Sequence, residues 1–216
     1  MTTRAALKRH AVAHASNFVA AIGALSLVLS SCALLPSTSP PIGDGGLLSH
    51  SPCVAPCFFG VEPGVTLLGE AKSILTSDSV CREPTDFDNE SVGGSRGFKC
   101  GEWITVSTIP DGELVGAVGF STVAPVTVES AVGSLGEPDW VSAIPTGVPE
   151  APKVVLLLYF DDYSTRLLLP EQDGRGYLLQ ADTPLERILY MARAEYLASR
   201  GTGGPWTGYG IYNAGP

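Results

Sequence analysis

The chain has 216 residues, of which 44% are hydrophobic and 16% are charged, so it has enough apolar material for a folded body and too little charge for a disordered one. All 22 acidic residues lie beyond residue 32 but only ten of the 13 basic ones do, which leaves that part with a net charge of −12. Such an acidic surface repels phosphate backbones, which argues against nucleic-acid binding. It also disfavours unassisted docking on anionic lipids, so membrane attachment requires an anchor.

Residues 1–31 have the features of an export signal. Arg4, Lys8 and Arg9 precede an apolar stretch over residues 18–29, which is shorter than the roughly 20 residues that span a bilayer. The stretch ends in Leu-Ser-Ser-Cys at residues 29–32, which resembles the lipobox of bacterial lipoproteins. The resemblance implies that residues 1–31 are removed and that Cys32 carries a diacylglycerol anchor. A plain signal peptide with a chance cysteine, or an uncleaved anchor helix, is the alternative.

A lipoprotein signal peptide predicts that the protein lies on the extracytoplasmic face of the cell membrane or the outer membrane, attached through the lipid on Cys32. Two acyl chains give stable attachment, whereas one chain alone is marginal. Residues 32–55 are rich in Pro, Ser and Gly, which predicts a flexible tether. We expect a globular domain over residues 56–200 and a glycine-rich, aromatic C-terminal segment over residues 201–216.

The cysteine count agrees with an oxidising compartment. With Cys32 lipidated, an even set of four remains, and two disulfides are expected. Three connectivities are possible, and sequence proximity favours Cys81 with Cys100 and Cys53 with Cys57. Zinc bound by these thiols is the competing interpretation, but their spacing lacks paired ligands. We therefore predict no metal site and no cofactor.

Local patterns predict an α+β domain of short helices on an antiparallel sheet. Thr66 can cap a helix that extends to about residue 76, where apolar residues recur at three- and four-residue spacing. A polar loop over 86–97 follows. Strands over 98–109 and 114–123 flank the turn at residues 110–112, and Thr127 begins a second helix that ends near residue 135.

The second part of the chain repeats this order. An extended segment over 140–144 precedes strands over 154–160, 166–169 and 177–180. A capping box that begins at Thr183 predicts a last helix whose apolar stripe extends to Tyr196. Residues 71–75 align with residues 131–135, which suggests two tandem helix-plus-strands halves.

Three stretches resemble known proteins. Residues 127–139, with Leu-Gly-Glu-Pro-Asp at their end, are similar to the helix-turn-strand unit of the small lipoprotein of the outer-membrane β-barrel assembly machinery and of the β-lactamase inhibitor protein. Residues 56–66 and 206–212 resemble the opening and closing motifs of uncharacterised bacterial lipoproteins. The resemblance implies an α+β interaction module and names no activity. The chain departs from the assembly protein in being longer and richer in cysteine.

Nothing in the sequence identifies a catalytic residue. The histidines are at positions 10, 14 and 50, in the expected signal peptide and tether, so we expect no imidazole in the folded body. A Gly-x-Ser-x-Gly string at residues 93–97 leads into a predicted strand instead of a helix. Asp161 and Asp162 are adjacent, which favours a turn over a catalytic pair of carboxylates. The acidic stretch 86–90 lacks the glycine and the glutamate that a calcium-binding loop requires.

Two classes of function follow. The first is a membrane-anchored, non-enzymatic binding or structural module with an envelope protein as its partner. The aromatic residues Trp206, Tyr209 and Tyr212 are candidate contacts for that partner, and they can equally cover an edge of the sheet. The alternative is an envelope enzyme that uses carboxylates alone, such as a glycan hydrolase, which requires two facing Asp or Glu side chains.

Overall fold

The computed structural model describes residues 42–89 and 94–214. The expected signal peptide, Cys32 and the first part of the expected tether lie outside these residues. Within the described part, no helix has the length and apolarity that crossing a bilayer requires.

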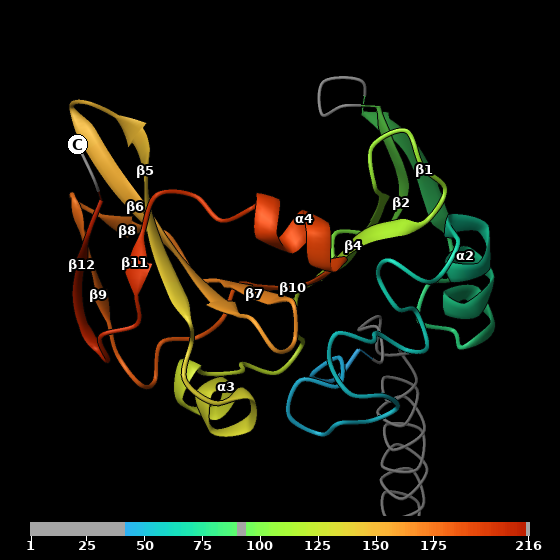
Figure 1. The fold of residues 1–216 in the computed structure, drawn as a ribbon, viewed down its shortest axis with the longest axis horizontal. Coiled ribbons are helices and arrows are strands. Elements are labelled where there is room, and N and C mark those ends of the chain that lie inside the picture. Colours follow the sequence, from blue (N-terminus) through green and yellow to red (C-terminus); the bar gives the residue numbers. More distant parts are fainter. Residues whose placement is uncertain (1–41, 90–93, 215–216) are drawn as a thin grey trace, which may run out of the picture. The chain divides into compact units, whose positions relative to one another are not determined.

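Ten strands of the described part form one antiparallel sheet (Figure 1). Its order is β1-β2-β3-β4-β10-β7-β6-β5-β11, and β8 pairs with β6. A smaller two-stranded sheet joins β9 to β12. The bounds are β1 Pro84–Asn89, β2 Ser95–Cys100, β3 Ile104–Thr108, β4 Val115–Phe120, β5 Trp140–Val148, β6 Ala151–Phe160, β7 Thr165–Leu168, β8 Gln172–Asp173, β9 Gly176–Leu179, β10 Arg187–Met191, β11 Gly204–Pro205 and β12 Gly210–Asn213. The protein is thus mostly β with some helix, compatible with the expected α+β class.

One pattern of elements occurs twice along the chain. Helix α2 (Leu68–Ser77) precedes β1 to β4, and helix α3 (Val128–Leu135) precedes β5, β6, β7 and β10. The last strands of the two runs, β4 and β10, pair at the centre of the sheet. In each run, two backbone hydrogen bonds join the start of the helix to the residues just before or at the start of the run's last strand, β4 or β10. Their donors and acceptors are Leu68 to Glu113 and Val115 to Thr66 in the first run, and Val128 to Thr183 and Leu185 to Val126 in the second.

The two helices pack on one face of the sheet. Their buried side chains, among them Leu75 of α2 and Ala131 of α3, join the main apolar cluster with Phe120 and the other inward residues of the strands. Helix α3 lies where it is predicted, and the Thr127 hydroxyl caps it by accepting from the Ser130 amide. Helix α2 begins at the predicted place, but its cap residue is Leu67, and Thr66 accepts from the Glu62 amide instead.

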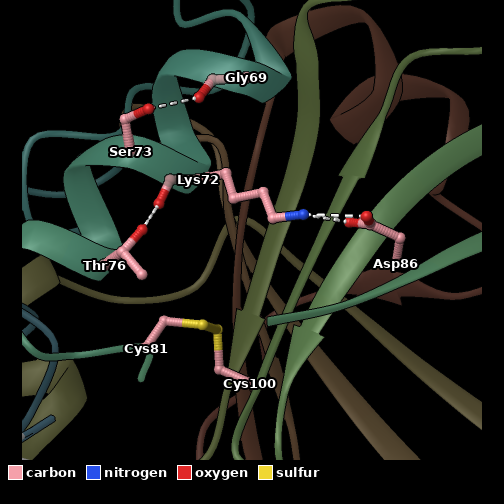
Figure 2. A network of polar contacts seen from close by, with 7 residues as sticks. All are labelled: Gly69, Lys72, Ser73, Thr76, Cys81, Asp86 and Cys100. Atoms are coloured by element: carbon pink, nitrogen blue, oxygen red, sulfur yellow. Dashed lines mark hydrogen bonds and ion pairs between the residues drawn. A yellow bond between two sulfur atoms is a disulfide. The ribbon is translucent and has the colours of Figure 1, made fainter. Parts of the chain in front are cut away.

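Helix α2 is fixed to the first strands by two links (Figure 2). The Lys72 ammonium reaches from the helix to the Asp86 carboxylate on β1, at 2.8 Å. A disulfide joins Cys81, just after the helix, to Cys100 at the end of β2. A second disulfide joins Cys53 to Cys57. The expectation of two disulfides is confirmed, and the pairs are the two that sequence proximity favours.

The expected flexible tether is folded from residue 42 onward, so that prediction is wrong for residues 42–55. Ile42 and Leu47 are fully buried in the main apolar cluster, and the Tyr190 hydroxyl donates to the Gly45 carbonyl at 3.2 Å. A Cβ at Gly45 would lie 2.2 Å from the ring of Phe120, so glycine is required for this close approach. The segment covers the centre of the helix-bearing face.

Two further expectations are wrong. The predicted polar loop over 86–97 is largely a hairpin, because β1 pairs with β2 from Pro84–Cys100 to Asn89–Ser95. The predicted last helix is strand β10 followed by the short helix α4 (Arg193–Ala198). Ile188 and Leu189 suggested one helical stripe, yet they point to opposite faces of a central strand that carries apolar neighbours on both sides.

Candidate binding site

The face of the sheet opposite α2 and α3 carries one continuous row of paired residues. The register joins neighbours across seven strands, in the order Lys99, Thr105, Gly119, Leu189, Arg166, Tyr159 and Trp140. Alternate residues of a strand point to opposite faces, so all seven belong to the same face. We call it the open face, because α2 and α3 cover the other one.

A hollow of about 360 Å³ lies at the centre of the open face. Five of its ten lining residues are apolar or glycine, two are hydroxyl residues and three are basic. Its residues are Lys99, Thr105, Ser107, Ala117, Gly119, Leu157, Arg166, Leu168, Arg187 and Leu189. Three of the ten basic residues beyond position 32 thus meet here, and no acidic residue of the described part of the chain lines the hollow. We call this place the cationic hollow.

Arg187 lies flat across the open face. Its guanidinium passes over β4, where a Cβ at Gly119 would lie 3.0 Å from Nε, and its Nη2 donates to the Thr105 hydroxyl at 2.7 Å. Burial lowers the pKa of Arg187, and the neighbouring charge of Glu186 opposes this effect. Arginine stays protonated at neutral pH, so the hollow keeps this positive charge.

Beside the hollow, Arg166 carries a buried hydrogen-bond donor without a partner in the described part of the chain. It stands on β7 between Leu189 and Tyr159, its cross-strand neighbours. Its Nε is buried and has no hydrogen-bond partner among the described residues. Buried donors are nearly always paired, so an unpaired one beside a hollow indicates where an acceptor from a ligand would fit.

The other end of the open face is covered by α4. Tyr196 of this helix packs against Tyr159 with ring centroids 5.9 Å apart, in a second apolar cluster that includes Leu157 and Met191. The Asp161 carboxylate accepts from the Tyr196 hydroxyl at 2.7 Å and also pairs with Arg200. Asp161 therefore holds α4 in place, and the cationic hollow lies beside the part that α4 covers.

The three aromatic residues predicted as partner contacts form one cluster. The Trp206 ring stacks on Tyr212 with centroids 6.3 Å apart and meets the edge of Tyr209 at 5.7 Å. Just before them, β11 pairs with β5 at the edge of the large sheet, so this segment does cover an edge. Beyond them, Ile211 on β12 pairs with Leu178 on β9. Tyr209, Ile211 and Leu178 are 46%, 71% and 49% exposed, which leaves an apolar patch on the surface.

One histidine belongs to the folded body, against expectation. The Nε2 of His50 lies 3.4 Å from the hydroxyl of Ser134 on α3. That hydroxyl donates to the Leu47 carbonyl at 2.8 Å, so the histidine does not receive its proton. Ser95, from the Gly-x-Ser-x-Gly string, lies within β2 and is buried. Neither serine has the arrangement of an activated nucleophile.

The acidic candidates have separate places in the fold. Asp86 belongs to β1 and pairs with Lys72, and Asp161 pairs with Arg200. Two exposed carboxylates, Glu70 and Glu113, line another hollow of about 350 Å³ beside Arg96 at the start of α2. Within the described part of the chain, no group of three or more His, Cys, Asp and Glu side chains could hold a metal ion.

Comparisons of the chain with protein-family models, with curated proteins and with solved structures find no match.

The sequence did not indicate the cationic hollow, because its basic residues are 67 and 21 positions apart along the chain and meet only through strand pairing. One signal was present. Arg166 lies within β7, Thr-Arg-Leu-Leu, and Arg187 begins β10, Arg-Ile-Leu-Tyr-Met, and the other residues of both strands are mostly apolar. A charged residue inside a strand that is apolar on both faces needs a polar contact, and so marks a candidate site.

Proposed function

We propose that the protein is a lipid-anchored extracytoplasmic binding module, and that it binds through the open face of its sheet. The observation that carries this proposal is the cationic hollow, where three basic side chains gather on a domain that is otherwise strongly acidic. The lipid on Cys32 and the position outside the cytoplasm belong to the same proposal. They are supported by the lipobox-like residues 29–32 and agree with the two disulfides.

We also propose that the two runs of elements are tandem copies of one helix-plus-strands unit. The repeated order of elements, the central pairing of β4 with β10 and the repeated hydrogen bonds at the helix starts support this. It agrees with the resemblance of residues 127–139 to the units of the β-lactamase inhibitor protein and the small assembly lipoprotein. That resemblance favours binding over catalysis.

An envelope protein is the macromolecular partner that we propose, with the patch of Leu178, Tyr209 and Ile211 as its contact. Leu178 and Ile211 are exposed cross-strand neighbours, and Tyr209 is an exposed aromatic residue two positions before Ile211. Exposed apolar and aromatic side chains of this kind are typical of protein–protein contacts. Tyr212 of β12 belongs to the aromatic cluster around Trp206, which therefore adjoins the two-stranded sheet of β9 and β12.

Photo-crosslinking in living cells tests the proposal. A benzophenone amino acid replaces Ser107 in the hollow, Ile211 in the patch, or Ser73 on the exposed side of α2 as a control. We expect defined adducts from position 107, a protein adduct from position 211 and only background from position 73. Equal labelling from all three positions, or none from 107, would contradict binding through the open face.

A further inference from the structure

We propose that the ligand of the cationic hollow is a small organic anion, in which one oxyanion group is attached to an apolar body. This rests on the proposed function, because it specifies the ligand of the same open face. The oxyanion is a carboxylate or a phosphate, since both accept hydrogen bonds from guanidinium groups.

The basic side chains of the hollow favour a negatively charged ligand. Lys99, Arg166 and Arg187 come from β2, β7 and β10 and face one space, and the structure pairs none of them with a carboxylate among the described residues. Glu186, which directly precedes Arg187 in the chain, is exposed and does not line the hollow. Three like charges repel one another, and a bound anion relieves this repulsion.

The hydrogen-bond donors select the kind of anion. Arg187 already uses Nη2 on Thr105, which fixes its guanidinium across Gly119. The buried Nε of Arg166 has no partner in the described part of the chain. An oxyanion has several acceptor positions and could serve both guanidinium groups at once, which chloride or a neutral hydroxyl cannot do as well.

The remaining walls select an apolar body. Leu168 and Leu189 are cross-strand neighbours of Arg187 and Arg166, and Leu157 and Ala117 also line the hollow. A hollow of about 360 Å³ lies at the lower end of the range for small-molecule sites, which combine mostly apolar walls with a few polar groups. The ligand is therefore larger than inorganic phosphate and smaller than a folded partner.

Methyl NMR of the full chain, as cells produce it and held in lipid nanodiscs, tests this inference. The methyl groups of Ala117, Leu168 and Leu189 report on the hollow, and those of Leu75 in the core serve as an internal reference. The probes are hexanoate and hexyl phosphate, with hexanol, hexylammonium and acetate as matched controls. Empty nanodiscs measure how far each probe partitions into lipid.

We expect hexanoate or hexyl phosphate to shift the hollow methyls in a saturable way, and the stronger of the two identifies the oxyanion. Hexanol, hexylammonium and acetate should bind at least about tenfold more weakly, because each lacks either the charge or the apolar body. Arg166→Gln and Arg187→Gln should each weaken binding about tenfold, whereas Lys153→Gln, in an exposed ion pair elsewhere, should leave it unchanged.

The same spectra show whether each variant is folded, and Arg166→Lys provides a variant that keeps the charge and loses Nε. Hexanol that binds as tightly as hexanoate would overturn the inference, and so would binding that survives both glutamine variants. If no anion binds while position 107 still gives defined adducts in cells, the ligand class is wrong and the binding module stands. If both experiments fail, the proposed function fails with the inference.

Discussion

The guanidinium of Arg187 on β10 donates to the hydroxyl of Thr105 on β3, across the whole width of β4. The contact is possible because β4 presents Gly119 at this point, where a side chain would meet the arginine. A second glycine of the same strand, Gly116, faces backbone instead of a flexible side chain. The two glycines therefore serve different purposes, one for the site and one for the fold.

Substitution of each glycine by alanine separates these purposes. In Gly119→Ala the new Cβ meets the movable end of Arg187, so we expect a loss of unfolding free energy below about 1 kcal/mol. In Gly116→Ala the new Cβ lies 2.7 Å from the backbone nitrogen of Ile109, so we expect a larger loss, of about 1–3 kcal/mol. Urea denaturation measures both. Equal losses would contradict this account.

The disulfide between Cys81 and Cys100 should contribute more stability than the one between Cys53 and Cys57. The first closes a loop with a sequence separation of 19 and the second one of 4, so in the chain-entropy model the first contributes about 3 kcal/mol and the second less. We expect the double alanine variant of the first pair to have the lower Tm by calorimetry. A larger drop for the second pair would show that the folded segment near residue 53 depends on its bond.

The stability that Asp44 contributes to the fold depends on pH. Burial opposes ionisation of its carboxyl, but hydrogen bonds from Ser49 and from the amides of Gly46 and Leu48 exceed that effect and lower its pKa. A lowered pKa adds stability above the unfolded value of about 3.9, and this stability is lost as pH falls through the folded value.

We therefore expect Asp44→Asn to be less stable than the parent at pH 7, by about 1 kcal/mol for this half-exposed group. The difference should shrink as the pH drops below about 4. Chemical denaturation at several pH values measures it, and Asp78→Asn on the exposed end of α2 is the control. A difference that stays constant with pH would rule out the carboxylate as its cause.

The anchor depends on Cys32. In Cys32→Ala we expect the precursor to keep its larger size and to incorporate no labelled palmitate, because the lipobox reading makes this thiol the site of acylation. Gel mobility and radiolabelling of whole cells measure both, with Ser31→Ala as a control that retains a small residue before the cysteine. If Cys32→Ala is processed and labelled like the parent, the chain is not a lipoprotein.

The sequence predicts the elements that depend on nearby residues, namely two helices and one hairpin. Thr127 and the apolar spacing of α2 and α3 were sufficient to locate both helices, and the turn at residues 110–112 located the hairpin of β3 and β4. The strand β10 was predicted as a helix because both of its faces are buried, which removes the alternation that marks a strand.

The site itself was beyond the reach of local patterns. The cationic hollow depends on which strands are neighbours, and the sheet places β10 between β4 and β7, although β4 is about 70 residues away along the chain. The segment of Ile42 and Leu47 has no apolar period, which is typical of a tether, yet both residues are fully buried against the helix-bearing face of the sheet. Such long-range packing is not visible in a single sequence.

Native mass spectrometry of the protein purified from cell envelopes tests most directly whether the open face binds a ligand. The parent is compared with Ala117→Trp, which fills the cationic hollow, and with Ser73→Trp, which adds the same side chain on the exposed side of α2. We predict that the parent and Ser73→Trp carry the same additional mass and that Ala117→Trp lacks it. No additional mass on any of the three proteins, or the same mass on all of them, would contradict binding in the hollow.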